Sequence, residues 1–187
     1  MYTAYGDLKP LFSTSHTRAD GGTARSNASS TGIALTEANL ETAMIALKQF
    51  KSGTGKKLNI GNGQIVLMVP EQLDKEAVII TASTLRSGTA NNDLNWYKGK
   101  ISVFINPWLG SDLTDVYGNS GSDTAWFLLA KGVHKMRFNW DKGPAYKTWE
   151  DEDKSVMWTK VKFRAKAFWS AAEGLYGSKG DGAAYSS

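Results

Sequence analysis

The chain has 187 residues, of which 41% are hydrophobic and 21% charged, a composition typical of a globular protein with a substantial core. It contains no cysteine, which excludes disulfides, thiolate metal sites and a thiol nucleophile. The net charge of +4, from 22 basic and 18 acidic residues, is too small by itself to indicate nucleic-acid binding.

The first readable segments are a polar loop and a helix. Residues 13–34 are rich in Ser, Thr, Gly, Asn and Ala, which predicts a loop with little order of its own. A helix is predicted after it, because Thr36 can cap its N-terminus and Glu37 lies near the positive end of its dipole. Apolar residues then recur at helical spacing: Leu40, Ala43, Met44, Leu47 and Phe50.

The middle of the chain is predicted to contain buried strands and a second helix. Ile65 to Val69 is a continuous apolar run, which predicts a strand buried on both faces. Pro70 ends this strand and suits the first turn of a helix. Similar apolar runs predict strands at Ile101 to Ile105 and Trp126 to Leu129. The stripe of the second helix contains Leu73, Ala77 and Ile80.

After Gly132 the pattern changes to alternation. Val133 to Trp140 and Ser155 to Trp169 are predicted to be a pair of long strands. In the second strand one face is apolar and predicted to be packed, with Met157, Thr159, Val161, Phe163, Ala165, Ala167 and Trp169. The other face is basic and predicted to be open, with Lys160, Lys162, Arg164 and Lys166.

Charged side chains near this pair of strands are the first candidates for a functional surface. The basic face has three interpretations: solvation that protects a long strand against aggregation, contact with an acidic partner, or contact with nucleic acid. The acidic run Glu150, Asp151, Glu152 and Asp153 lies at the preceding turn. Adjacent carboxylates in a strand point to alternate faces and cannot converge on one cation, so a solvated hairpin tip is favoured.

The stretch STSHTRADGG contains the residue types of a hydrolase: Ser15, His16 and Asp20. Neighbours in a loop cannot be preorganised as a catalytic triad, and no G-x-S-x-G motif is present, so a polar connecting loop is favoured. His16 and His134 lack a metal-binding pattern. SGTGKK does not fit a phosphate-binding loop, because Phe50 and Lys57 stand where Gly and Ser or Thr are required. No metal or cofactor is therefore expected.

Several pieces of sequence occur in an order that is familiar over nearly the whole chain. They are KPLFSTSH with ADGG, LTEANLETAMIAL, GNGQIVLMVPEQLDKEAVIITAST, NNDLNWYKGKISVFINPWL, DTAWFLLA and AFWSAAEGLYGSKG. In this order they resemble the tailed-bacteriophage major capsid proteins of the Hong Kong 97-type fold, most closely the Mu-like major head subunit branch.

The resemblance implies an α+β fold with an axial domain, a central sheet flanked by helices, and a peripheral domain with long β-strands. Residues 30–132 and 170–182 would form the axial domain, and residues 133–169 the peripheral β-arm. Residues 1–29 would be a connecting segment and residues 183–187 a tail. The N-terminal arm, extended loop and spine helix of such proteins are not visible. We therefore expect a fragment or a short relative that is by itself a monomer or small oligomer.

The resemblance also implies a function. The chain would be a structural subunit of an icosahedral phage head that encloses double-stranded DNA by self-assembly, with no active site and no cofactor. Its partners would be other copies of itself, with non-specific DNA contact left open. No apolar run approaches the roughly 18 residues of a membrane span. The head would be assembled in the bacterial host cytoplasm. Candidate intersubunit contacts are Lys160, Lys162, Arg164, Lys166, Glu150, Asp151, Glu152 and Asp153.

Three alternatives stay open at this point. An encapsulin-like nanocompartment subunit would share the fold but enclose protein cargo. A small hydrolase would use Ser15, His16 and Asp20 in a deep pocket. A sugar-binding module, suggested by the seven Trp residues, would need several of them exposed on one surface.

Overall fold

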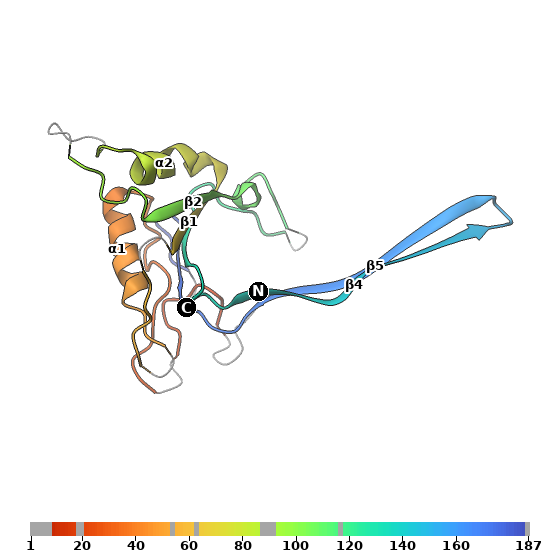
Figure 1. The fold of residues 1–187 in the computed structure, drawn as a ribbon, viewed down its shortest axis with the longest axis horizontal. Helices are drawn as coiled ribbons and strands as arrows, with labels where there is room; N and C mark the ends of the chain where they lie inside the picture. Colours follow the sequence, from red (N-terminus) through yellow and green to blue (C-terminus); the bar gives the residue numbers. More distant parts are fainter. Residues whose placement is uncertain are drawn as a thin grey trace. The chain divides into compact units, whose positions relative to one another are not determined.

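The computed structural model describes residues 9–17, 21–52, 55–61, 64–86, 93–115 and 118–185. The chain divides into two compact units, one of Met1–Lys135 with Ala171–Ser187 and one of Met136–Ser170. We call them the core unit and the hairpin unit. Figure 1 shows their elements along the chain.

The core unit is built on a mixed four-stranded sheet in the order β2-β1-β3-β6. β1 (Ile65–Val69) pairs in parallel with β2 (Ile101–Ile105) and antiparallel with β3 (Trp126–Ala130). These three strands confirm the predictions from the apolar runs. β6 (Leu175–Ser178) adds to β3 in antiparallel fashion, so the chain completes its first sheet only after the hairpin.

The two faces of this sheet are buried to different extents. One face carries the fully buried side chains of β1 and β3: Ile65, Leu67, Val69, Trp126 and Leu128. On the other face Val66 and Met68 are only partly buried, so the prediction that β1 is buried on both faces is wrong in degree. Phe12 covers part of this second face, with its ring 5.0 Å from that of Phe127 and 5.5 Å from that of Tyr185.

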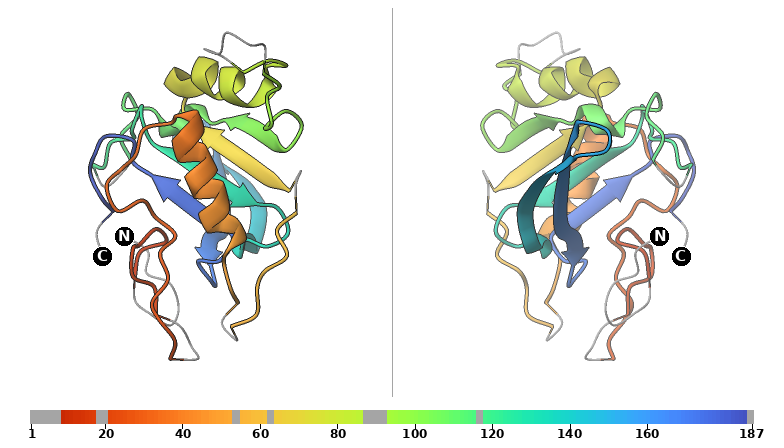
Figure 2. Two further views of the ribbon diagram at one scale, coloured as in Figure 1. Left: turned by 90° about the vertical axis from the view of Figure 1, so that its left-hand side faces the viewer. Right: turned by 90° about the vertical axis from the view of Figure 1, so that its right-hand side faces the viewer.

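Helix α1 (Glu37–Lys48) supplies the layer that covers β3 and β6 (Figure 2). Its N-terminus is capped as predicted, because the Thr36 side chain accepts a hydrogen bond from the Asn39 backbone N–H at 3.2 Å. Its apolar stripe faces the sheet and is buried, which confirms the helical pattern. The buried members are Leu40, Ala43, Met44 and Leu47.

The second predicted helix begins with a tighter turn. Pro70 is followed by the 3₁₀ turn η1 (Glu71–Leu73) and then by α2 (Asp74–Ala82), which packs against β2 and β1. A further 3₁₀ turn, η2 (Pro107–Leu109), follows β2, and the Asn106 side chain accepts a hydrogen bond from the Trp108 N–H at 3.1 Å.

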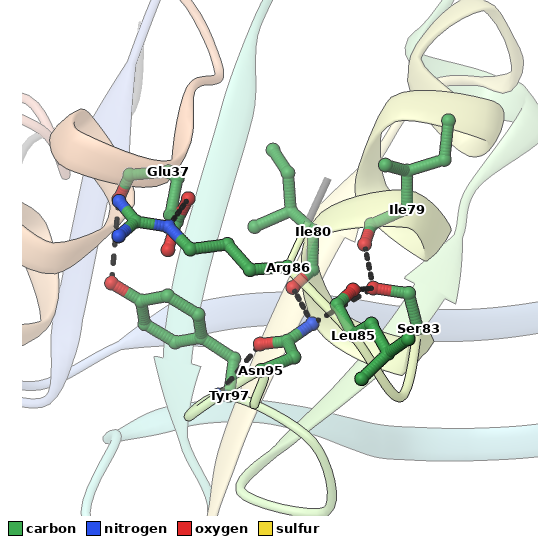
Figure 3. A network of polar contacts seen from close by, with 8 residues as sticks. All are labelled: Glu37, Ile79, Ile80, Ser83, Leu85, Arg86, Asn95 and Tyr97. Carbon is green, nitrogen blue, oxygen red and sulfur yellow. Dashed lines mark hydrogen bonds and ion pairs between the residues drawn. The ribbon is translucent and has the colours of Figure 1, made fainter. Parts of the chain in front are cut away.

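Polar contacts tie the segment that leads into β2 to both helices (Figure 3). Arg86 Nε donates a hydrogen bond to Oε2 of Glu37, the first residue of α1, at 2.9 Å. Asn95 Nδ2 donates to the Ile80 carbonyl oxygen at 2.8 Å on α2. The Tyr97 hydroxyl donates to the Glu37 carbonyl oxygen at 3.4 Å, and burial, aided by nearby carboxylates, raises the pKa of Tyr97 to about 12.

The described parts of the polar segment, residues 13–17 and 21–34, form a loop as predicted, but buried hydrogen bonds hold this loop in place, so the prediction of little order is wrong for them. Asn27 is fully buried. Its Oδ1 accepts from the Ser13 N–H at 2.9 Å, and its Nδ2 donates to the Leu11 carbonyl oxygen at 2.7 Å. Ala28 also forms a bridge with Gly177 at the edge of the sheet. Buried polar groups must be paired, and here the side-chain amide of Asn27 supplies the hydrogen bonds that a helix or sheet would otherwise give to the backbone.

The hairpin unit consists of two long antiparallel strands, β4 (Met136–Asp151) and β5 (Val156–Trp169). The prediction of paired long strands is confirmed, but β4 runs far beyond Trp140. It passes through Gly143 and Pro144 with register shifts between Trp140 and Lys142 and between Lys142 and Ala145. These shifts interrupt the alternation that would have revealed the rest of the strand.

No described residue of the hairpin unit is buried. The predicted packed face of β5 is therefore wrong for this chain: Phe163 is 65% exposed and Val161 48% exposed. The alternation of side chains is present, but the described residues of the hairpin unit form a two-stranded sheet with no second layer among them.

Candidate assembly interface

The register of the hairpin assigns its side chains to two faces, because residues directly opposite each other point to the same side. The apolar face is held by aromatic contacts. Phe138 and Trp140 lie with ring centroids 5.4 Å apart, and Trp140 and Phe163 with centroids 6.0 Å apart. Its large exposed side chains are Met136, Phe138, Trp140, Tyr146, Met157, Val161 and Phe163.

The basic face carries the basic side chains of both strands. Lys142 reaches it only because the bulge after Trp140 brings it opposite Arg164; uninterrupted alternation would have placed it on the apolar face. Sequence reasoning identified the members from β5 and missed those from β4. Together they are Arg137, Lys142, Lys147, Lys160, Lys162, Arg164 and Lys166.

The acidic run does not form one cluster. Glu150 lies opposite Met157 on the apolar face, and Asp151 lies opposite Val156 on the basic face. Glu152 and Asp153 follow in the turn. The carboxylates diverge, as the alternation predicts, so the end of the hairpin is an acidic surface rather than a cation site.

Electrostatic forces within the hairpin are unfavourable on the basic face. Lys147 lies directly opposite Lys160, and like charges in that position are destabilising. Arg164 donates to Asp141 at 2.9 Å, which is the one ion pair within the described residues of the hairpin. Both side chains are largely exposed, so the pair contributes at most about 1 kcal/mol.

A shallow hollow lies near the end of the hairpin. Lys147, Lys160 and Lys162 surround it, and Trp149 forms its end toward the turn. The Lys147 ammonium lies 6.0 Å from the centroid of the Trp149 ring. The remaining lining residues are Ala145 and Tyr146. The hollow is therefore basic with an aromatic wall, an arrangement that suits a negatively charged group.

The structure describes two of the three proposed hydrolase residues, and both have partners within the core unit. His16 is only 3% exposed, pairs through its backbone with Arg25, and has Nε2 3.3 Å from the Leu11 carbonyl oxygen. The Ser15 hydroxyl accepts a hydrogen bond from Lys9 Nζ at 2.6 Å. Asp20 lies outside the described residues. Among the described residues, His16 is thus part of the packing of the core unit, not an exposed loop residue.

Other site types have little support. The described part of the chain contains no group of three His, Asp or Glu side chains suited to a metal ion. Within the same residues, no helix is long and apolar enough to cross a membrane. The exposed tryptophans lie on different surfaces: Trp96 and Trp108 in the core unit, Trp140 on the apolar face, and Trp149 directly opposite Trp158 on the basic face.

The comparison with known families agrees with a structural role. The model of a family described as "Phage capsid protein" matches residues 3–178. No curated protein is detectably similar in sequence. The family match favours neither the nanocompartment nor the hydrolase alternative. Capsid proteins are structural components of the virion that assemble in many copies, which accounts for a chain with a large uncovered surface. The chain belongs to this family of phage capsid proteins.

Proposed function

We propose that the chain is a subunit of an icosahedral phage head of the Hong Kong 97-type fold, in the Mu-like major head subunit branch. The head assembles in the bacterial host cytoplasm and encloses double-stranded DNA. The family match and the order of the sequence pieces quoted above support this proposal. The observation that carries it is the uncovered apolar face of the hairpin unit.

An isolated two-stranded hairpin is marginally stable in water, and contiguous exposed apolar side chains mark interaction surfaces. Phe138, Tyr146 and Phe163 are each more than half exposed. Burying such a side chain contributes about 1.5–3 kcal/mol, so covering several of them supplies the free energy of a subunit contact. In a shell of identical subunits, the cover comes from a neighbouring copy.

In this proposal the two units represent the two domains of the Hong Kong 97-type fold. Residues 30–132 and 170–182 correspond to the axial domain, and residues 133–169 to the β-arm of the peripheral domain. Residues 1–29, which are grouped with the core unit, would be a connecting segment that precedes the axial domain in the chain, and residues 183–187 a tail. The pairing of β3 with β6 supports this assignment, since it returns the chain to the central sheet after the arm.

The charged residues of the hairpin complete the intersubunit contact. Lys160, Lys162, Arg164 and Lys166 meet the acidic run Glu150, Asp151, Glu152 and Asp153 of a neighbour. Both sets are exposed almost throughout. Exposed ion pairs are screened beyond about 8 Å at physiological ionic strength, so assembly is expected to weaken as salt is added.

The test is electron microscopy of the phage particles together with mass spectrometry of their proteins. The proposal expects this chain, alone or within its parent protein, as the most abundant component of DNA-filled shells. Shells filled with protein cargo, or particles that lack the chain, would overturn the phage-head assignment.

A charge reversal tests the contact. Lys160→Glu with Lys162→Glu and Arg164→Glu is expected to abolish shells or shift their salt dependence. The matched control reverses Lys56, Lys75 and Lys131, which are exposed on the core unit. Equal assembly of both variants across a salt series would remove the intersubunit role and leave a solvated face.

A further inference from the structure

Three levels of side chains follow one another on the basic face at the end of the hairpin. Asp151 lies opposite Val156 nearest the turn. Trp149 lies opposite Trp158 at the next level. Lys147 lies opposite Lys160 at the third level. Levels two residues apart are about 7 Å apart along a strand, so the acidic and basic levels are separated by about 14 Å, with the tryptophans between them.

These charges are not neutralised within their own hairpin. Among the described residues, neither Lys147 nor Lys160 forms an ion pair, and neither does any carboxylate of the acidic run. The Trp149–Trp158 level is the physical reason, because it keeps the acidic level out of reach of the lysines. The two opposed lysines and the hollow between them therefore favour an anionic group from outside the hairpin.

We propose that this end of the hairpin, the tip patch, is a two-fold contact between two copies of the chain. The tip patch consists of Lys147, Trp149, Asp151, Asp153, Trp158, Lys160 and Lys162. A two-fold axis across the strands at the tryptophan level places the acidic level of each copy over the basic level of the other. Asp151 then meets Lys147, and Asp153 meets the hollow beside Lys162. The proposal rests on the proposed function, which makes the hairpin an assembly surface.

The charge pattern selects this arrangement over its alternatives. If the two hairpins ran in the same direction, the acidic level of one copy would lie against the acidic level of the other. The lysine levels would also face each other, and both pairs would repel. When the two hairpins run in opposite directions, the acidic level of each copy lies against the basic level of the other. Both copies then use the same surface, as an isologous interface requires. Trp149 and Trp158 are about half exposed, and the contact covers them at its centre. Large aromatic side chains in that position commonly dominate binding free energy.

Nucleic acid is a less suitable occupant of the tip patch. A phosphate backbone that follows the lysines toward the turn meets Asp151 and then Glu152 and Asp153, which repel it. The second copy uses both signs of charge, whereas a polyanion uses only one. Strand twist limits the overlap of two hairpins to a short length, so each contact is weak and gains strength from repetition in a shell.

A charge-swap experiment on the 187-residue chain tests the contact. Lys147→Glu with Lys160→Glu reverses the two opposed lysines and leaves Lys162 as the one basic residue of the tip patch, and Asp151→Lys with Asp153→Lys makes an all-basic tip patch. Self-association is measured by sedimentation equilibrium at low and high salt, with far-UV circular dichroism to verify folding. Each variant alone is expected to self-associate about tenfold or more weakly than the natural chain.

The mixture of the two variants is the decisive measurement. Equal amounts are expected to form a one-to-one complex at low salt that dissociates at high salt. The matched control mixes Lys75→Glu with Lys131→Glu and Glu41→Lys with Glu76→Lys, which carry the same charges on the core unit. A mixture that associates no better than this control would overturn the two-fold contact.

Two further measurements cover a variant that does not fold and the binding of nucleic acid to the tip patch. If a reversed variant does not fold, Lys147→Gln with Lys160→Gln replaces it, and unchanged self-association of that variant would overturn the contact. Loss of binding to a DNA oligonucleotide in the variant with Lys147→Glu and Lys160→Glu, without complex formation in the mixture, would identify nucleic acid as the occupant. Failure of the proposed function appears separately, as absence of the chain from phage particles.

Discussion

Trp126 and Trp149 show how differently the two units treat the same residue type. Trp126 lies in β3, is fully buried, and donates through Nε1 to the Ile33 carbonyl oxygen at 2.9 Å. Trp149 lies in β4 and is 42% exposed. Both belong to strands with alternating side chains. The difference is the layer above them: α1 covers the sheet of the core unit, while no described residue of the hairpin unit covers its two strands.

Apolar alternation therefore indicates that a strand needs a covering layer, without indicating which molecule supplies it. In the core unit the helix on the same chain supplies it. In the hairpin unit we propose that another copy does. Folding of the isolated chain should therefore depend on the core unit, and assembly on the hairpin unit.

The largest contrast is expected between Trp126→Ala and Phe163→Ala. The first removes a fully buried ring and its hydrogen bond to Ile33, and should lower the free energy of unfolding by about 3–5 kcal/mol. The second truncates an exposed ring and should change it by no more than about 0.5 kcal/mol. Urea unfolding followed by circular dichroism measures both. A large loss for Phe163→Ala in the isolated monomer would mean that the hairpin is covered within the chain.

A buried polar residue of the core unit is expected to have the next largest effect on stability. Asn27→Ala leaves the Ser13 N–H and the Leu11 carbonyl oxygen without their buried partner, and should cost about 1–3 kcal/mol. The control is Asn59→Ala, at an exposed position. Equal unfolding midpoints for the two variants would show that the segment at residues 13–34 contributes no stability.

A helix cap gives a smaller effect. Thr36→Ala removes the acceptor for the Asn39 N–H and should cost about 1 kcal/mol. Thr159→Ala in β5 removes only a weak contact with Thr148 at 3.5 Å between exposed hydroxyls, and should be nearly neutral. The same denaturation experiment compares them. A greater loss for the hairpin variant would contradict the assignment of folding stability to the core unit.

The smallest effect at neutral pH is expected for Tyr97→Phe. Burial raises the pKa of Tyr97 from 10.0 to about 12, so the neutral phenol is favoured in the folded state. Its contribution is complete below pH 10.0 and is lost as pH rises from there toward about 12. Unfolding midpoints of the natural chain should therefore fall more steeply than those of the variant over this range. Parallel curves would place Tyr97 in contact with solvent.

Much of the core unit was predictable from local pattern. Ile65 to Val69 and Ile101 to Ile105 are strands with the predicted ends, and Thr36 caps the helix that its sequence context indicates. The ordered segment around Asn27 was not predictable, because its hydrogen bonds join residues distant in sequence. Nothing in a run of Ser, Gly, Thr and Asn distinguishes such a segment from a mobile loop.

The candidate interface was predictable in part. The alternation of β5 identified Lys160, Lys162 and Arg164 as one face, and the structure places them so. The contribution of β4 was hidden by the bulges around Lys142, which shift the parity of the pattern at Gly143 and Pro144. Alternation of side chains can be recognised in a sequence only where the strand has no bulge, so that each residue has one partner on the opposite strand.

Local sequence specifies which residues alternate, where helices start, and which strand faces are apolar enough to need a cover. These properties depend on near neighbours, through backbone geometry and side-chain period. Only the tertiary structure decided that Trp126 is covered and Phe163 is not, that Lys142 joins the basic face, and that Lys147 opposes Lys160. Those outcomes depend on which segments lie next to each other in space, because both burial and charge pairing require contacts between residues that are distant in sequence.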